Sequence, residues 1–218
     1  MAAALITLVL LSYLLGSIPT GFLVAKAKGV DIRSVGSGNI GATNVFRILG
    51  KGPGIFVLTA DAMKGVFVVA VIAPAIQRIT VPDPIAEHLP ALAGICAILG
   101  HNYTCWLKFK GGKGIATTAG VFAALAPAAF GIALATWLVV FAASRYVSLA
   151  SIVAAVALPL AVWLTGNGGL LIGVSAALGA LAIYKHKANI ERLLAGTENR
   201  IGAKKPESPA PPPEERKT

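Results

Sequence analysis

A glycine-rich segment, residues 35–47, carries side chains that could bind an anion. It reads Val-Gly-Ser-Gly-Asn-Ile-Gly-Ala-Thr-Asn-Val-Phe-Arg. Glycine permits positive φ angles and a close approach of the backbone, so successive N–H groups can converge on a phosphate. We predict a phosphate-binding loop here, and a flexible linker between two helices is the alternative. The candidate contacts are Gly36, Ser37, Gly38, Asn39, Thr43, Asn44 and Arg47.

The same segment satisfies the Gly-x-Gly-x-x-Gly pattern of dinucleotide-binding folds, with Asp61 at the spacing of a ribose-binding acid. That pattern needs a strand–turn–helix unit, whereas this segment lies between two strongly apolar stretches. Asp61 falls inside the second stretch, one helical turn before Lys64. We therefore reject a dinucleotide site and interpret Asp61 and Lys64 as a structural ion pair.

A second segment, residues 101–117, begins with His101 and surrounds a Gly-Gly pair with lysines. Ammonium groups suit phosphate, and the glycines expose backbone donors. The segment is not a Walker A loop, because Gly114 replaces the Ser or Thr that would bind magnesium. An anchor for anionic lipid headgroups is the alternative for the lysines, and a helix-end cap is the alternative for His101. The cluster consists of Lys108, Lys110, Gly111, Gly112 and Lys113.

A third polar segment, residues 186–198, follows the last apolar stretch. His186 and Glu191 superficially match the His-x4-Asp box of acyltransferases that use soluble donors, but the acid is Glu and the segment lies at the wrong end of the chain. The polar residues of this segment could belong to the same binding site. The alternative is that the segment is an amphipathic helix lying on the membrane surface. Ser148 lies three residues after Arg145, at the edge of another apolar run, so it could lie on the same side of the membrane as this segment.

The composition indicates whether these segments belong to a water-soluble protein or to a membrane protein. The 218 residues are 56% hydrophobic and 13% charged, with a mean hydropathy of +0.77, whereas soluble domains carry about 25% charged residues. The uncharged runs 2–25, 115–144 and 146–184 each exceed the roughly 20 residues that a helix needs to cross a bilayer. We predict an all-α, polytopic integral membrane protein.

The distribution of Lys and Arg predicts the orientation. Basic residues cluster after the first apolar run, near residue 110, at Arg145 and at the C-terminus. If these clusters are cytoplasmic, the N-terminus lies outside. A break at Pro127 and a hairpin turned at residues 166–169 then give seven helices. We expect one membrane domain, residues 1–200, and a disordered cytoplasmic tail, residues 201–218, because the tail is rich in Pro and charge.

Missing motifs narrow the chemistry. The sequence has no Gly-x-Ser-x-Gly nucleophile motif and no His/Cys cluster of the kind that binds zinc. It also lacks the paired-aspartate motif that binds nucleotide-linked alcohols through magnesium. We expect no metal, no cofactor and no nucleic-acid partner. A small transporter for an organic phosphate is the alternative from another class. Transporters place binding residues near the bilayer midplane, whereas these polar segments gather at one membrane face.

Four motifs, taken in order, resemble the acyl-phosphate-dependent glycerol-3-phosphate acyltransferases of bacteria, the PlsY family. They are Gly-Ser-Ile-Pro-Thr-Gly at 16–21, the segment from 36 to 44, Phe-Lys-Gly-Gly-Lys-Gly at 109–114 and Asn-Ile-x-Arg-Leu-x-x-Gly-x-Glu at 189–198. The likeness covers residues 5–198. It implies seven helices in the bacterial plasma (inner) membrane, with the active site facing the cytoplasm. It also implies acyl phosphate and glycerol 3-phosphate as substrates, and lysophosphatidic acid and phosphate as products, in the first step of phospholipid synthesis.

Carried over residue by residue, the resemblance implies a set of site residues. An acyl phosphate is already activated, so direct attack by the glycerol hydroxyl needs no enzyme nucleophile, and positioning with charge stabilisation carries the reaction. Either His101 or a substrate phosphate accepts the proton, and the sequence does not decide between them. The catalytic residues would be Ser37, Arg47, His101, Lys108 and Asn189. Among the binding residues, Ser148 and Glu198 also follow from the resemblance. The polar segments themselves add the binding residues Gly36, Gly38, Asn39, Thr43, Asn44, Lys110, Gly111, Gly112, Lys113 and Arg192.

Overall fold

The computed structural model describes residues 1–79 and 86–202, and every regular element within these ranges is helical. This confirms the predicted all-α class for the described part of the chain. The elements in order are α1 (Ala2–Ser17), α2 (Thr20–Lys26), α3 (Ala42–Leu49), α4 (Lys51–Phe67), η1 (Val68–Ile72), α5 (Ala73–Ile79), η2 (Ala86–His88), α6 (Leu89–Asn102), η3 (Cys105–Leu107), α7 (Ile115–Leu125), α8 (Pro127–Ser144), α9 (Val147–Leu164), α10 (Gly169–Lys185) and α11 (Lys187–Leu194).

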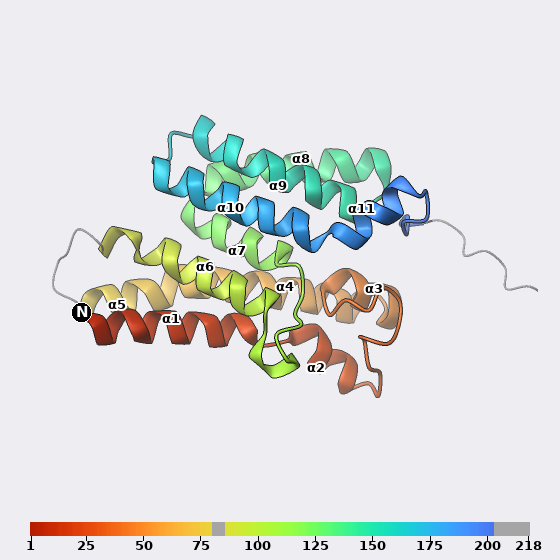
Figure 1. Cartoon of the computed structure of the whole chain (residues 1–218), viewed down its shortest axis with the longest axis horizontal. Coiled ribbons are helices and arrows are strands. Elements are labelled where there is room, and N and C mark those ends of the chain that lie inside the picture. The colour runs from red at the N-terminus through yellow and green to blue at the C-terminus, as the bar shows by residue number, and fades with distance from the viewer. Residues whose placement is uncertain (80–85, 203–218) are drawn as a thin grey trace, which may run out of the picture.

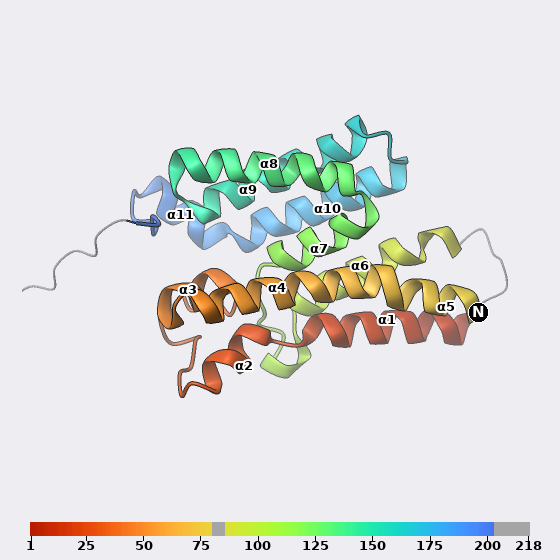
Figure 2. The same cartoon turned by 180° about the vertical axis from the view of Figure 1, so that it is seen from behind.

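The long helices form two groups that run along the long axis of the molecule (Figures 1 and 2). One group contains α1, α4, α5 and α6, and the other contains α8, α9 and α10. Helix α7 lies between them and packs against α4, α6 and α8. The short helices α2, α3 and α11 gather at one end of the long axis, opposite the N-terminus (Figure 1).

The outer surface of the helices is apolar, as a lipid-embedded protein requires. Large side chains such as Val139, Val156 and Trp163 are more than half exposed. Four helices within the described residues are long and apolar enough to cross a membrane, and a fifth is added if α10 and α11, bent by 58°, form one span. The four are Ala2–Lys26, Lys51–Arg78, Pro127–Ser144 and Val147–Leu164.

Two predicted boundaries are confirmed. Helix α7 ends at Leu125 and α8 begins at Pro127, because proline lacks the N–H that would continue the helix but fits its first position. The predicted hairpin is formed by α9 and α10, with the turn between Leu164 and Gly169.

The count of seven spans stays a prediction. Helix α7 has 11 residues, which at 1.5 Å per residue gives about 16 Å, well short of the roughly 30 Å hydrocarbon core. Helix α6, with 14 residues, is also shorter than the roughly 20 residues that a straight span needs. The predicted disordered tail lies mostly outside the described residues. Its first residue, Ile201, donates a backbone hydrogen bond to the carbonyl of Arg145.

Small residues bring the helices that carry the site into close contact. Gly16 of α1 lies against the backbone of Ala97 in α6, and Gly120 of α7 lies against the backbone of Ala62 in α4. A Cβ atom at either glycine would overlap the facing carbonyl. Membrane helices commonly pack through such small residues, since lipid gives no hydrophobic drive for their association. The two contacts join α1 to α6 and α7 to α4.

Candidate active site

A cavity of about 600 Å³ lies among α3, α4, α7, α8, α9 and α10. Its lining changes in character from polar to apolar. The polar and charged lining residues include Ser37, Asn39, Thr43, Asn44, Arg47, Asp61, His101, Lys113, Ser148, His186, Asn189 and Glu198, and the large apolar ones include Phe122, Phe130, Leu134, Trp137, Phe141 and Leu158. The second set is called the apolar arm below.

The apolar arm follows α8. Phe130 and Phe141 both line the cavity, and their separation of eleven residues corresponds to about 16 Å along a helix. Trp137 stacks on Phe141 with ring centroids 5.0 Å apart, and its indole N–H donates to Ser151 Oγ over 3.1 Å. These residues were not predicted from the sequence, because apolar side chains within an uncharged run carry no motif.

A group of side chains, called the cationic cluster here, is built around Glu198. One carboxylate oxygen accepts hydrogen bonds from Ser148 Oγ at 3.1 Å and from Asn189 Nδ2 at 2.8 Å. The other accepts from Arg192 Nε at 2.7 Å. The ammonium of Lys113 donates to the Asn189 side-chain oxygen. The cluster, which consists of Arg47, Lys113, Ser148, Asn189, Arg192 and Glu198, joins the loop before α7 to α3, α9 and α11.

Positive charge dominates the cationic cluster. Burial, with repulsion from Arg192 and Arg47 and partial compensation by Glu198, lowers the pKa of Lys113 to about 8. Burial also lowers the pKa of the Arg47 guanidinium. Burial alone would raise the pKa of Glu198, but hydrogen bonds from Arg192, Asn189 and Ser148 bring it below its ordinary value. Three cations therefore surround one carboxylate, which favours an additional anion.

The loop before α3 is organised by the buried side chain of Asn44. Its Oδ1 accepts from the Ser37 amide at 2.9 Å, and its Nδ2 lies within 3.2 Å of the carbonyls of Ile32, Val35 and Asn39. Gly36 and Gly38 have φ angles of 61° and 68°, which L side chains rarely adopt.

The N–H groups of this loop are largely used within it. Those of Ser37, Gly38 and Gly41 donate to Asn44, Val35 and Asn39. The predicted phosphate contact through these three amides therefore has no free donor in this conformation. Ser37, Asn39, Gly41 and the first residues of α3 line the cavity, while Gly36 and Gly38 do not.

The second glycine loop also folds back on the protein. The amides of Gly111 and Gly112 donate to the carbonyls of Asn102 and His101 at 3.2 and 3.0 Å. A Cβ atom at Gly112 would overlap Nε2 of His101. These glycines allow close packing against the end of α6, and neither lines the cavity.

Of the three lysines in this loop, Lys113 alone lines the cavity. Lys108 and Lys110 are exposed, and Lys108 adopts a left-handed conformation with φ of 52°. The structure therefore separates the predicted lysine group into one cavity residue and two surface residues.

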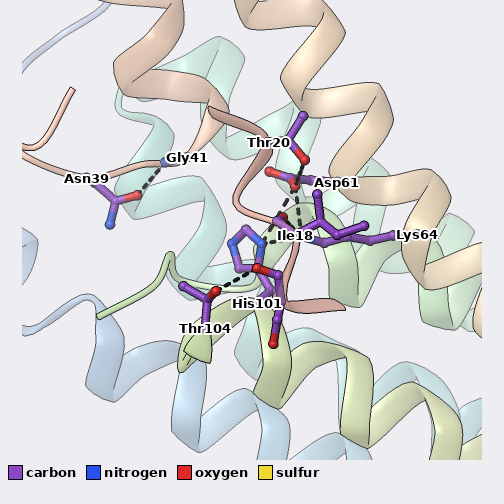
Figure 3. Close-up of polar contacts among 9 residues, drawn as sticks. Ile18, Thr20, Asn39, Gly41, Asp61, Lys64, His101 and Thr104 are labelled. Atoms are coloured by element: carbon purple, nitrogen blue, oxygen red, sulfur yellow. Dashed lines mark hydrogen bonds and ion pairs between the residues drawn. The ribbon is translucent and has the colours of Figure 1, made fainter. Parts of the chain in front are cut away.

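His101 belongs to a buried cluster that the sequence analysis did not assemble (Figure 3). The predicted ion pair is confirmed, since Lys64 Nζ lies 2.9 Å from Asp61 Oδ1. Lys64 also lies 2.9 Å from His101 Nδ1, and Thr20 donates to Asp61. We call Thr20, Asp61, Lys64 and His101 the inner cluster. Charged residues inside a membrane span are usually paired or functional, so the positions of Asp61 and Lys64 could have indicated this cluster from the sequence.

No three His, Cys, Asp or Glu side chains are grouped as a metal site in the part of the chain that the structure describes. His186, which the sequence analysis set aside with its box, lines the cavity and is buried, with Nδ1 2.7 Å from the carbonyl of Ala182.

Comparisons with known proteins agree with the resemblance seen in the motifs. The family model described as glycerol-3-phosphate acyltransferase matches residues 6–196. Proteins of that name from Geotalea daltonii and Geobacter metallireducens are 51% and 52% identical over 200 and 192 residues, covering 89% and 88% of this chain and 96% and 95% of those relatives. The relative from Desulforudis audaxviator is 48% identical over 205 residues, covering 94% of this chain and 99% of that protein.

Two solved structures share the fold. The glycerol 3-phosphate form of PlsY (YgiH), an integral membrane glycerol 3-phosphate acyltransferase, has a TM-score of 0.83 and 41% identity over 91% of this chain and 96% of that one. The lysphosphatidic acid form of PlsY (YgiH) has a TM-score of 0.80 and 40% identity, covering 91% and 95%. The chain therefore belongs to the glycerol-3-phosphate acyltransferase family and is a multi-pass membrane acyltransferase of the PlsY type.

Proposed function

We propose that the protein transfers a fatty acyl group from acyl phosphate to the hydroxyl of sn-glycerol 3-phosphate. The products are lysophosphatidic acid (1-acylglycerol 3-phosphate) and phosphate. One observation carries the proposal: a single cavity joins the cationic cluster to the apolar arm. A phosphate-bearing lipid product needs both environments at once.

The polar side of the cavity suits the two phosphate groups. Arg47 and Lys113 supply cations within the lining, and Arg192 adds a third through Glu198. Ala42 and Thr43, the first residues of α3, also line the cavity. A helix N-terminus carries free N–H groups and a partial positive charge, which stabilise an anion.

The apolar arm suits the fatty chain. Its aromatic and aliphatic walls extend over about 16 Å of α8, and burying each methylene contributes about 0.8 kcal/mol. The solved PlsY (YgiH) structures are described as glycerol 3-phosphate and lysphosphatidic acid forms of that protein. These descriptions support the same substrate and product classes for this chain.

The chemistry is a direct acyl transfer. The glycerol hydroxyl oxygen attacks the acyl carbon and forms the ester bond. The bond from that carbon to the phosphate oxygen breaks, and inorganic phosphate leaves with the electron pair. We favour a substrate phosphate oxygen as the acceptor of the hydroxyl proton, because Nδ1 of His101 faces the Lys64 ammonium at 2.9 Å and is not free to take that proton. Arg47 and Lys113 would hold the reactants together and stabilise the departing charge.

We also propose seven crossings, with the N-terminus outside, the C-terminus in the cytoplasm and the cavity opening to the cytoplasm of a bacterial inner membrane. The Lys and Arg distribution supports this orientation. The start of α1 and helix α11 also lie at opposite ends of the long axis (Figure 1). A C-terminal tag should be protected in intact cells, and a tag labelled from outside would contradict the topology.

Phosphate release by the detergent-purified protein tests the activity. We expect release only when acyl phosphate and glycerol 3-phosphate are both present, with equimolar lysophosphatidic acid. The transporter alternative predicts no product, but uptake of an organic phosphate by reconstituted vesicles.

A further inference from the structure

Lys64 is surrounded by three hydrogen-bond acceptors, one for each proton of its ammonium group. Asp61 Oδ1 and His101 Nδ1 each lie 2.9 Å from Nζ, and the carbonyl of Ile18 lies at 3.3 Å. The Lys64 side chain is 6% exposed. An ammonium group donates three hydrogen bonds and accepts none. The inner cluster therefore holds a fully satisfied lysine cation.

This arrangement determines the tautomer of His101. Because the ammonium only donates, Nδ1 of His101 must accept, so this nitrogen carries no proton. A neutral imidazole then carries its proton on Nε2. A protonated histidine that donates to Asp61 is the competing arrangement. The distance from Nδ1 to Asp61 Oδ1 is 3.7 Å, which is too long for a hydrogen bond, and a second cation would lie next to Lys64.

The break between α1 and α2 supplies two of the contacts. Helix α1 ends at Ser17, so the carbonyl of Ile18 lies outside a helical ladder, where it accepts from the Thr20 amide at 3.0 Å and from Lys64 at 3.3 Å. Thr20, the first residue of α2, donates its hydroxyl to Asp61 over 3.1 Å. These contacts give a structural role to the Gly-Ser-Ile-Pro-Thr-Gly motif, which lies outside the cavity lining.

His101 lies where its other nitrogen can serve a ligand. His101 and Asp61 line the cavity, and in Figure 3 Nδ1 faces Lys64 while the second ring nitrogen points away from it. Nε2 lies against Gly112, in the same loop as Lys113. The N–H of Nε2 is therefore the group that His101 can offer to a substrate oxygen.

We propose that Asp61 and Lys64 are positioning residues, which hold His101 as a neutral imidazole with its proton on Nε2 so that it donates a hydrogen bond to a substrate oxygen. The inference rests on the proposed function, since the oxygen would belong to a phosphate or to the acyl carbonyl. A donor already oriented toward developing negative charge needs no reorganisation during the reaction.

Nitrogen-15 NMR of the histidine side chains tests the tautomer without any substrate. The protein has three histidines, and a His101→Gln variant identifies the signals of His101. We expect an unprotonated Nδ1 and a protonated Nε2 at neutral pH in the wild type. In Lys64→Met the proton should move to Nδ1 and bond to Asp61. A wild-type His101 protonated on Nδ1 overturns the proposal, whatever the variants do.

Kinetics separate positioning from mere stabilisation of the fold. Lys64→Met leaves Asp61 buried without its partner and could unfold the protein, so the decisive variant is Asp61→Asn/Lys64→Met, which removes both charges. This double variant should remain folded and keep the KM for glycerol 3-phosphate, while kcat falls on the order of 10²-fold. Wild-type kcat in the folded double variant would overturn the proposal.

Two further variants complete the experiment. Ser175→Ala removes a buried hydroxyl of α10 that lies outside the cavity lining, and it should keep wild-type kinetics. In a His101→Ala background the Asp61→Asn/Lys64→Met change should lower kcat no further, because residues that act through one group are not additive. An undiminished additional loss would contradict positioning through His101. If the wild type has no acyltransferase activity, the proposed function fails, and the NMR result alone decides the tautomer.

Discussion

The cationic cluster and the inner cluster both contain lysine and a carboxylate, but they differ in how completely their hydrogen bonds are satisfied. Lys64 meets three acceptors and is buried. Lys113 has one hydrogen bond with a side chain, and its neighbours Arg47 and Arg192 repel it. The ammonium of Lys64 therefore has no proton left for a ligand and can only orient its neighbour His101. The incompletely satisfied cations are the ones equipped to bind phosphate.

Removing a cation from the cationic cluster should have the largest effect. In Arg47→Ala we expect kcat/KM to fall by about 10²-fold to 10³-fold, since losing one partner of a desolvated charge pair costs about 2–5 kcal/mol. The matched control is Arg33→Ala, which removes an exposed arginine paired with Asp31 outside the cavity lining. It should keep kcat/KM within about twofold, because exposed ion pairs contribute about 0–1 kcal/mol. Equal losses in the two variants would contradict the distinction.

A change next to the inner cluster should act on kcat. In Gly112→Ala the new Cβ would overlap the His101 ring, so we expect kcat to fall on the order of 10²-fold because the imidazole is displaced. Gly52→Ala is the control, since nothing lies within 4 Å of its Cβ position. Stopped assays at saturating substrate measure both. Unchanged turnover in Gly112→Ala would show that the position of His101 is not important.

The charge of Lys113 sharpens the comparison through pH. Its pKa of about 8 in the free enzyme predicts that the cation is present below pH 8 and lost above it, so kcat/KM should decline as pH rises through 8. A bound phosphate raises the pKa of Lys113, so the decline in kcat should occur at higher pH. Lys113→Arg stays charged throughout and should lose this limb. If the decline in kcat/KM above pH 8 persists in Lys113→Arg, another titrating group causes it.

The smallest effect is expected at Lys108. Lys108→Gly removes an exposed charge and relieves the left-handed backbone, so activity should stay within about twofold of wild type. A loss of 10²-fold would mean that Lys108 reaches the substrate, as the family resemblance implied, and that the segment 101–117 adopts another conformation during turnover.

Features that depend only on neighbouring residues in the chain could be predicted from the sequence. Uncharged runs predicted long apolar helices, and the missing N–H of Pro127 predicted the break between α7 and α8. The sequence also singled out polar residues from three loops, including Arg47, Lys113 and Glu198, which the structure brings to one cavity.

The remainder depends on contacts between distant segments. Lys108, Lys110 and Lys113 have the same chemistry, so only the packing of their loop shows which one enters the cavity. The glycines at 111 and 112 looked like phosphate donors because their N–H groups were assumed free, and those groups bond to the end of α6. The contact of His101 with Lys64 joins residues 37 positions apart.

Direct attack without an acylated protein is the central claim, and a single-turnover experiment tests it most directly. Protein in stoichiometric amount is mixed with acyl phosphate alone, and phosphate release and the intact protein mass are followed together. We predict no burst of phosphate and no gain in mass until glycerol 3-phosphate is added. A burst of one phosphate per protein, with an acyl group attached to a side chain such as Ser37 or Ser148, would contradict this account.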